Sequence, residues 1–327
     1  MPTRTIAACA LMLASVPAAA QAPAPGFFAA LRDVDLRMAT IAYRLTTANA
    51  ALCDALAPTP GLAIHAIGQY APDMRADARA AFGFAAPVAV EAVVPDSAAA
   101  RAGIAADDAV IAVAGQIVAG KPGNTASSAQ RDAVRALIAG QPAAQPLTLT
   151  LLRAGTRFDA TVAASPGCRS AFEVLLGPGM EASADGDLVQ IGSRFFERYD
   201  DAQVAVVVAH ELAHNILHHA RRLDAAGVKR GMLAEFGRNG RLFRRTENEA
   251  DLLGMYLLRN AGYDPASAVT FWRMHGSDVD GGLFRSRTHP SSAARAQAIA
   301  DEIARMPPNA PMPYVPPLLA TRAAPLE

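Results

Sequence analysis

The sequence is short of several features that define large protein classes. It contains only three cysteines and one tryptophan in 327 residues, and Lys+Arg and Asp+Glu number 30 each. Because there is no basic excess to neutralise phosphates, the composition argues against a dedicated nucleic-acid binder. Two apolar stretches, 5–16 and 204–217, come closest to a transmembrane span, but both are shorter than the roughly 20 residues that a helix needs to cross a bilayer. We therefore expect no transmembrane segment and no nucleic-acid partner.

The sequence is rich in small apolar side chains, above all alanine. Apolar residues make up 52% of the chain and charged residues 18%. This composition is enough to build a sizeable core and is too apolar for an intrinsically disordered chain. The length predicts two or three domains.

The first residues have the pattern of an export signal. Arg4 precedes the first apolar stretch, and three small alanines precede Gln21. This arrangement predicts a cleaved signal peptide at 1–20, and hence a periplasmic or secreted protein. The residues ending at Cys9 superficially resemble a lipid-attachment motif, but most of the apolar segment follows this cysteine, which argues against lipidation.

Cleavage would leave two cysteines, Cys53 and Cys168. In an exported protein an even number permits one disulfide, which in the chain-entropy model would stabilise the fold by about 4–5 kcal/mol for a loop of this length. Two independent buried thiols are the alternative. Neither cysteine has a histidine nearby in sequence, so we do not expect a catalytic cysteine.

Changes in composition divide the rest of the chain into four parts. A Pro/Ala linker and an amphipathic helix occupy 21–60. Short β-branched runs separated by Gly, Pro and Asp predict a β-rich domain at 61–165, and longer helical patterns predict a mainly helical domain at 166–306. The tail at 307–327 is rich in Pro and Ala, and we expect it to be loosely held.

The β-rich domain resembles a PDZ domain. Residues 93–104 (VVPDSAAARAGI) and 107–115 (DDAVIAVAG) are similar to a characteristic run of bacterial protease PDZ domains, with Asp-Asp where Gly-Asp is usual. The resemblance implies that an extended peptide adds to a sheet edge as a further strand. It places Phe82, Gly83 and Phe84 at the carboxylate-binding loop. The alternative is a PDZ-shaped spacer with an unused groove.

The strongest chemical signal is the motif His210-Glu211-Leu-Ala-His214, inside a helix predicted at 201–223. Histidines spaced i, i+4 lie on one helix face about 6 Å apart, so two imidazoles can bind one metal ion. Glu211 would then act as the general base on a zinc-bound water. Three titratable groups in an apolar run are costly to bury without a partner, which favours a metal site over core histidines.

A pair of carboxylates further along could complete this site. A catalytic zinc has three protein ligands and one open position. Glu247 and Asp251 are spaced i, i+4 in a helix predicted at 246–261, and hence lie on one face. Glu247 would supply the third ligand, and Asp251 would accept an N–H from a ligating imidazole. We expect Glu249 to point elsewhere and to be solvated. An exposed acidic helix start is the alternative for the pair.

The HELAH motif together with Glu-x-x-x-Asp at 247–251 resembles metallopeptidase family 48. These gluzincins include HtpX-, BepA- and CAAX prenyl protease-type members. The resemblance implies an α+β fold, with a mainly helical zincin-type metallopeptidase domain carrying a small sheet, plus the PDZ-like β-rich domain. It also implies one Zn²⁺ per chain, bound by His210, His214 and Glu247. Because no span is predicted after the signal, the soluble periplasmic branch, associated with protein quality control, is the one favoured.

The same resemblance implies roles for other positions. Ser183 and Ala184 lie in a segment similar to the family's edge strand, which aligns substrate. His289 and Arg295 match a Thr-His-Pro…Arg motif whose histidine lies near the metal. There His289 would stabilise the tetrahedral intermediate or latch the open zinc position, and a helix-start histidine with no metal role is the alternative. Several members also carry a cysteine on each side of a PDZ domain, as this chain does.

The remaining histidines and one basic stretch give weaker signals. His218 is too far along the predicted helix to share the ion, and His219 faces the opposite side. We expect both, with His65 and His275, to be structural or solvated. The Arg- and Gly-rich stretch 221–245 predicts a solvated, flexible flap near the site, and peripheral membrane contact is its alternative.

These patterns together predict an exported zinc-dependent endopeptidase that hydrolyses unfolded or misfolded envelope proteins. Its expected partners are polypeptide substrates and a peptide ligand of the PDZ-like domain. The alternative is a latched, chaperone-like or PDZ adaptor protein with little peptidase activity. A purely structural zinc site is disfavoured, because such sites fill all four positions with protein ligands, mostly cysteine.

Overall fold

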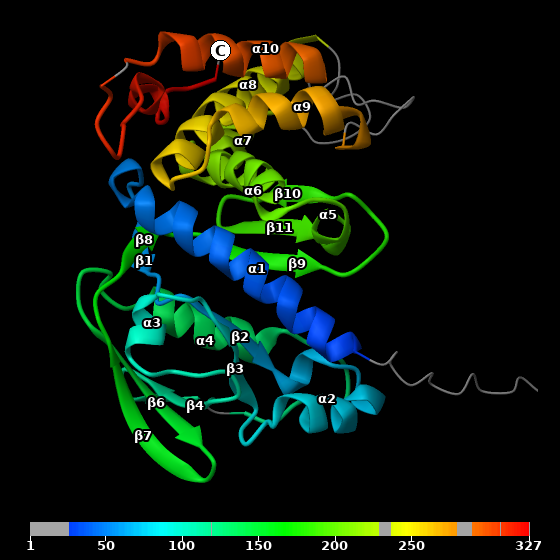
Figure 1. Cartoon of the computed structure of the whole chain (residues 1–327), viewed down its shortest axis with the longest axis vertical. Helices are drawn as coiled ribbons and strands as arrows, with labels where there is room; N and C mark the ends of the chain where they lie inside the picture. The colour runs from blue at the N-terminus through cyan, green and yellow to red at the C-terminus, as the bar shows by residue number, and fades with distance from the viewer. Residues whose placement is uncertain (1–25, 119, 229–236, 280–289, 308, 327) are drawn as a thin grey trace, which may run out of the picture.

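The computed structural model describes residues 26–118, 120–228, 237–279, 290–307 and 309–326. The chain forms two parts with separate apolar cores, a β-rich part and a mainly helical part (Figure 1). Helix α1 (Phe27–Ala48) runs diagonally between them and packs against strands of both. The predicted signal peptide at 1–20 and the predicted site residue His289 lie outside the described residues.

The β-rich part contains a six-stranded antiparallel sheet. The strand order is β2-β3-β4-β6-β7, with β5 paired to β4, so β2 and β7 are its edges. Helix α4 packs against the edge strand β2. The elements of this part are β1 (Leu56–Pro58), β2 (Leu62–Ala66), α2 (Arg75–Phe82), β3 (Val88–Val93), α3 (Ala98–Arg101), β4 (Ala109–Val113), β5 (Gln116–Ile117), α4 (Ala129–Ala139), β6 (Leu147–Arg153), β7 (Thr156–Val162) and β8 (Pro166–Cys168).

The β-rich part leaves and rejoins the rest of the chain at one point. Strand β1 pairs antiparallel with β8, which brings the two ends of the part together. Cys53, just before β1, is bonded to Cys168, with their Cα atoms 5.4 Å apart. The disulfide that the sequence permitted is therefore present, and it encloses the whole β-rich part.

The mainly helical part contains a three-stranded sheet of order β10-β11-β9, in which β10 is an edge strand. Helix α6 packs on this sheet, and α8 and α9 pack on α6 (Figure 1). Short 3₁₀ helices lie at Ala50–Leu52, Ile67–Gln69, Pro72–Met74 and Pro317–Thr321. The elements of the helical part are β9 (Ala171–Leu175), β10 (Ala182–Ala184), β11 (Leu188–Gly192), α5 (Ser193–Arg198), α6 (Asp201–Ile216), α7 (His219–Ala225), α8 (Gly237–Asn260), α9 (Ala266–Val279) and α10 (Ser292–Arg305).

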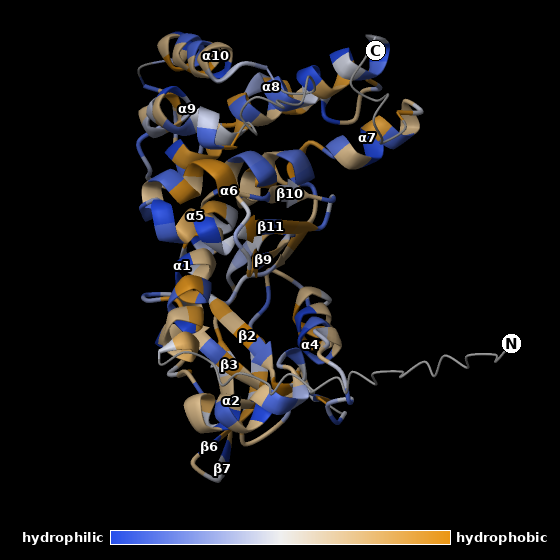
Figure 2. Cartoon of the chain, turned by 90° about the vertical axis from the view of Figure 1, so that its right-hand side faces the viewer, coloured by the Kyte–Doolittle hydropathy of each residue, from blue (hydrophilic) through white to orange (hydrophobic). Residues whose placement is uncertain are grey.

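Helix α6 forms although five of its residues, 204–208, are mostly β-branched valines. Its N-terminus is capped by Asp200, whose side chain accepts a hydrogen bond from the backbone N–H of Gln203 at 2.9 Å. All the residues of 204–208 are buried, because the sheet lies on one side of α6 and other helices lie on the other. Figure 2 shows apolar colour on α6 and on the strands beneath it. Burial on several sides outweighs the modest helix propensity of valine.

Three helical predictions need correction. The single helix predicted at 201–223 is two helices, because His218 adopts a left-handed backbone conformation (φ 55°) that ends α6. Helix α8 begins at Gly237, nine residues before the predicted start, so part of the stretch predicted to be a flexible flap is helical. Helix α9 had no counterpart in the sequence analysis.

The Pro/Ala-rich tail is packed against the protein, contrary to the prediction that it is loosely held. The backbone N–H of Tyr314 donates to the Asn260 side chain at 2.9 Å. The side chains of Leu319 and Leu326 are buried. Buried leucines anchor this segment despite its composition. Within the described residues, every helix is too short or too polar to cross a membrane.

Candidate metal centre

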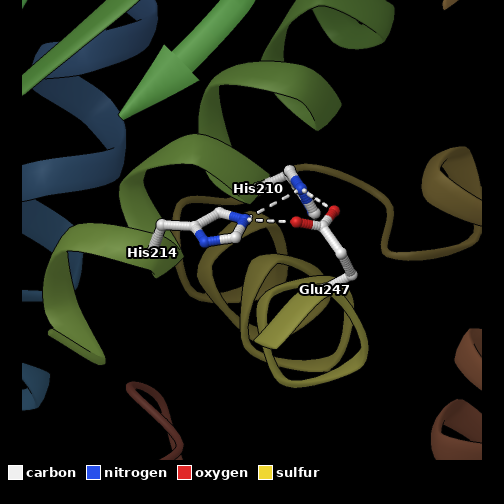
Figure 3. Close-up of side chains that lie close together, drawn as sticks. All are labelled: His210, His214 and Glu247. Carbon is white, nitrogen blue, oxygen red and sulfur yellow. Dashed lines mark hydrogen bonds and ion pairs between the residues drawn. The ribbon is translucent and has the colours of Figure 1, made fainter. Parts of the chain in front are cut away.

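Three side chains from two helices point at one another (Figure 3). His210 and His214 come from α6, and Glu247 comes from α8. The Nε2 atoms of the two histidines are 3.2 Å apart. One carboxylate oxygen of Glu247 lies 3.3 Å from Nε2 of His210, and the other lies 3.6 Å from Nε2 of His214. Among the described residues, these three are the group whose ligand atoms cluster closely enough to hold a metal ion.

The spacing of the three ligand atoms fits zinc. Zinc binds imidazole nitrogens and carboxylate oxygens at about 2.0–2.2 Å with tetrahedral angles, which separates ligand atoms by about 3.3–3.5 Å. The three observed separations, from 3.2 to 3.6 Å, match these values. Two neutral nitrogens and one carboxylate are also ligands that zinc accepts, and three protein ligands leave one position for substrate.

A buried ion pair contacts His210 at Nδ1, the ring nitrogen that does not face the other two candidate ligands. Nδ1 of His210 lies 3.1 Å from Oδ1 of Asp251. Arg295 donates two hydrogen bonds to Asp251, from Nε at 2.7 Å and from Nη2 at 2.6 Å. The Arg295 guanidinium stacks 3.3 Å over the ring of Trp272, the one tryptophan of the chain. Asp251 therefore lies where its predicted role requires, and Arg295 lies beside both Asp251 and His210, with its Nη2 3.1 Å from Nδ1 of His210; the role itself stays a prediction.

The proton affinities of the two histidines diverge. Burial and Arg295 lower the pKa of His210, but hydrogen bonds to Asp251 and Glu247 outweigh them and raise it to about 9. Burial holds the pKa of His214 well below its usual range. Without a metal, the raised pKa favours the doubly protonated, charged form of His210 near neutral pH, and the lowered pKa favours the neutral form of His214. Because metal ligation requires neutral imidazoles, binding of a metal displaces one proton from His210.

Glu211, the predicted general base, lies on the same helix as the two histidines, and its role stays a prediction. It follows His210 on α6, and only 8% of its surface is exposed. Successive residues on a helix are rotated by about 100°, so Glu211 projects to one side of the face that carries the two histidines.

His214 is also supported, through His219 and Glu249, two residues that the sequence analysis placed away from the metal site. Its Nδ1 lies 2.9 Å from Nδ1 of His219, which is 1% exposed. Nε2 of His219 lies 3.2 Å from the carboxylate of Glu249. His219 was expected to face away from His214. The left-handed turn at His218 instead folds it back toward the site, and no residue pattern in the sequence announces such a turn.

Glu249 is not solvated, contrary to the prediction. It accepts hydrogen bonds from Nη1 of Arg222 at 2.8 Å and from Nε of Arg245 at 2.9 Å, besides its contact with His219. Although burial opposes the shift, these three partners lower the pKa of Glu249 to about 2. Two arginines of the basic stretch are therefore held in an ion-pair network with Glu249, in which Arg222 is 5% exposed and Arg245 is partly exposed.

The predicted substrate strand lies at a sheet edge. Ser183 and Ala184 belong to β10, which pairs on one side with β11. This strand packs against α6, the helix that carries the two histidine ligands. The backbone N–H of Gly186 donates to the Asn215 side chain at 2.8 Å, which ties the hairpin to α6.

The Phe82–Gly83–Phe84 loop lies at the end of α2. Phe82 is 1% exposed, and its ring packs edge-on against Phe28 of α1 and against His65. Gly83 adopts the left-handed conformation that ends the helix (φ 59°). The aromatic side chains thus form a small core between α1 and the β-rich part, and a role of this loop in binding peptides stays a prediction.

The other histidines have partners away from the metal centre. His65 is 1% exposed and lies 3.2 Å from the Tyr70 hydroxyl. Nε2 of His218 lies 2.8 Å from Asp54, and Nε2 of His275 lies 3.2 Å from the Gln203 side chain.

A glycine sets the distance between the two ligand-bearing helices. A Cβ atom at Gly254 of α8 would lie 3.2 Å from the backbone N and 3.3 Å from Cα of His210. Because those atoms are backbone, a side chain at this position would push α8 and α6 apart by a few tenths of an ångström. The sequence analysis missed this residue, because a glycine inside a helical pattern is equally compatible with a simple surface position.

Two histidines from one helix, a glutamate from a second helix and a glutamate beside the first histidine are the ligand set and base of a metalloendopeptidase. Comparison with known proteins agrees with this class. Residues 231–303 match the model of Peptidase family M48. This match contains Glu247, Asp251 and Arg295, whereas the histidine motif lies before it.

Two curated proteins are similar to part of the chain. The mitochondrial metalloendopeptidase OMA1 of Schizosaccharomyces pombe is 33% identical over 119 residues, covering 30% of this chain and 35% of that protein. The mitochondrial metalloendopeptidase OMA1 of Arabidopsis thaliana is 32% identical over 123 residues, covering 31% of this chain and 24% of that protein. The chain thus spans about a third or less of the length of these relatives.

Proposed function

We propose that this protein is a zinc-dependent endopeptidase of the soluble, exported type, acting on unfolded or misfolded polypeptides of the cell envelope. The observation that carries the proposal is the convergence of His210, His214 and Glu247 within 3.2–3.6 Å, next to the buried Glu211. The match to Peptidase family M48 and the OMA1 relatives support a metallopeptidase. The export and the class of substrate rest on the sequence analysis alone.

The side chains divide the work of peptide hydrolysis. When bound, the zinc ion supplies Lewis acidity that polarises the scissile carbonyl and makes water a better nucleophile at neutral pH. Glu211 takes the proton of the attacking water and returns it to the nitrogen of the leaving amine. Asp251 and Arg295 keep His210 in the orientation that ligation requires. Each of these roles uses a group that is buried, where electrostatic interactions are stronger than in water.

Substrate would bind as an extended strand. The edge strand β10 packs beside α6, and backbone pairing with its free edge would hold polypeptides of many sequences. This mode suits unfolded proteins, because a folded substrate has few strands free to pair.

The test is hydrolysis of a reduced and alkylated model protein by the purified chain and its Glu211→Gln variant. Removal of a general base is expected to slow cleavage about 10²–10⁴-fold while zinc stays bound. Glu197→Gln is the matched control, because Glu197 is an exposed glutamate paired with Arg194 on α5. Zinc content is measured in all three proteins. Full cleavage by Glu211→Gln would refute the proposal. If no protein cleaves although all contain zinc, a chaperone-like or adaptor function is favoured instead.

We also propose that the β-rich part is a PDZ-like domain that binds an extended apolar peptide. Strand β2 is an edge of its sheet, and α4 lies along it. Residues of β2, α4, α1 and β9 line a cavity of about 1000 Å³. A peptide added to the edge of β2 would place its side chains in this cavity.

A blocking substitution on α4 tests the peptide site. Ala136 lines the cavity and is exposed, so Ala136→Arg would fill the groove without disturbing the core. Ala129→Arg, at an exposed position of α4 outside the cavity lining, is the control. Binding of a fluorescent apolar peptide library is expected to fall for the first variant alone. Equal binding by all proteins would exclude this groove.

Export has its own measurement. Amino-terminal sequencing of the protein from a fractionated bacterial host is expected to begin at Gln21 in the periplasmic fraction. An intact first residue in that fraction would refute cleavage after residue 20.

A further inference from the structure

We infer that His219 is a positioning residue for the metal centre, acting through a hydrogen-bonded chain that runs from His214 through His219 to Glu249. This inference rests on the metal site of the proposed function and deepens it. It assigns a role to a buried histidine that neither ligates the metal nor lies in the motif.

The direction of each hydrogen bond follows from the geometry. The atom of His214 that faces His210 and Glu247 is Nε2, so the hydrogen of the neutral ring belongs on Nδ1. That Nδ1 lies 2.9 Å from Nδ1 of His219, which must therefore present its lone pair and accept. A neutral His219 then carries its hydrogen on Nε2, the atom that lies 3.2 Å from a Glu249 oxygen. Every donor along the chain thus meets an acceptor.

The far end of the chain is held in place. Arg222 and Arg245 donate to different oxygens of Glu249, at 2.8 and 2.9 Å. Glu249 cannot rotate away from His219 without breaking these ion pairs. Its negative charge therefore acts on His214 through one intervening imidazole.

The two ligating histidines are supported in different ways. Asp251 contacts His210 directly, at 3.1 Å from its Nδ1. For His214 the carboxylate of Glu249 is one ring further away, and His219 fills the gap. His219 reaches this position because the preceding residue, His218, has a left-handed backbone conformation. This conformation costs a residue with a side chain roughly 1 kcal/mol or more.

The first experiment measures zinc affinity by competition with a chelator, in proteins confirmed to be folded. His219→Ala and His219→Gln are expected to bind zinc about 10–100-fold more weakly, because the acceptor for His214 is lost. In His219→Asn the side-chain oxygen takes the place of Nδ1, so its affinity should stay within about threefold of the wild type. A merely structural role would not separate Asn from Gln in this way. His65→Gln, at an equally buried histidine outside the site, is the matched control.

The second experiment reads the hydrogen positions directly. In the zinc-loaded wild-type protein labelled with ¹⁵N-histidine, two-bond ¹H–¹⁵N correlation spectra are expected to show His219 with its hydrogen on Nε2 and His214 with its hydrogen on Nδ1. A hydrogen on Nδ1 of His219 would overturn the inference, as would a folded His219→Ala protein with wild-type zinc affinity. This spectrum also decides the question if His219→Ala does not fold.

Neither experiment depends on proteolysis, which separates the inference from the proposed function. A protein with these zinc affinities and tautomers that cleaves no substrate would refute the peptidase and leave the role of His219 intact. An active peptidase whose His219→Ala variant binds zinc normally would do the reverse.

Discussion

Arg295 binds both carboxylate oxygens of Asp251, and the two side chains are only 3% and 2% exposed. They come from α10 and α8, and Asp251 in turn contacts His210 of α6, one of the three candidate metal ligands. One ion pair thereby joins three helices at the metal centre. Its geometry is the bidentate one that a guanidinium forms and an ammonium does not.

Arg295→Lys is therefore expected to damage the site although it keeps the charge. A lysine would satisfy one oxygen of Asp251 and leave the other without its partner, so zinc affinity should fall about tenfold. Arg295→Ala should in addition lower the free energy of unfolding by about 3–5 kcal/mol, because it leaves Asp251 buried and uncompensated. Chelator competition and urea unfolding measure the two effects. Arg305→Lys, at an exposed arginine of the same helix, should change neither, and an unaffected Arg295→Lys would contradict the argument.

The close approach of α8 to α6 at Gly254 predicts that a larger residue there weakens zinc binding. Gly254→Ala gains helix propensity, yet its Cβ would meet backbone atoms of His210 at 3.2–3.3 Å, and backbone cannot move as a side chain can. We expect zinc affinity to fall, and Gly254→Val to lower stability by about 1–3 kcal/mol through overpacking. Chelator competition and thermal unfolding test this. Gly123→Ala, where a Cβ meets nothing within 4 Å, should be neutral.

The disulfide is expected to contribute strongly to the stability of the fold and not to zinc binding. Cys53 and Cys168 are 115 residues apart in sequence, so the chain-entropy model gives about 4–5 kcal/mol for this loop. The double variant Cys53→Ser, Cys168→Ser should unfold at a correspondingly lower urea concentration and still bind zinc, since neither cysteine is a ligand. The wild-type protein in reductant is the second arm. An unchanged urea midpoint in both arms would show that packing alone holds the two ends together.

A buried carboxyl predicts that stability falls at alkaline pH. Burial, and next the charge of Asp35, raise the pKa of Glu91 to about 9 from its ordinary value of 4.5. Because the folded state binds this proton more tightly than the unfolded state, the associated stability is complete below about pH 4.5 and is lost as the pH rises through 9.

Replacing the Glu91 carboxyl tests the predicted direction of this pH dependence of stability. Glu91→Gln removes the titration, so thermal unfolding at pH 8–9 should occur a few degrees higher than in the wild type, for a gain of about 1–2 kcal/mol. At pH 5 the two proteins should differ much less. Glu197→Gln, at an exposed glutamate, should follow the wild type at both values. Wild-type and Glu91→Gln proteins whose stability falls equally between pH 5 and pH 8–9 would contradict the assignment.

The sequence by itself determined the candidate ligands. The spacings of His210 with His214 and of Glu247 with Asp251 are properties of a helix, in which residues four apart share a face. That local geometry does not depend on the rest of the fold, so motif and site coincide. The division into a β-rich and a helical part, and the possibility of one disulfide, could also be inferred without knowing the fold. They follow from the residue composition along the chain and from the number of cysteines.

The tertiary structure alone decided what lies around those ligands. His219 reaches His214 only because the chain turns left-handed at His218, and Glu249 is held beside His219 only because two arginines from α7 and α8 meet it there. The approach of α8 to α6 at Gly254 likewise depends on which helices pack together. A periodic pattern predicts the face a residue occupies on its own helix. It carries no information about where that helix breaks or which other helix packs on it, and those two facts complete the metal centre.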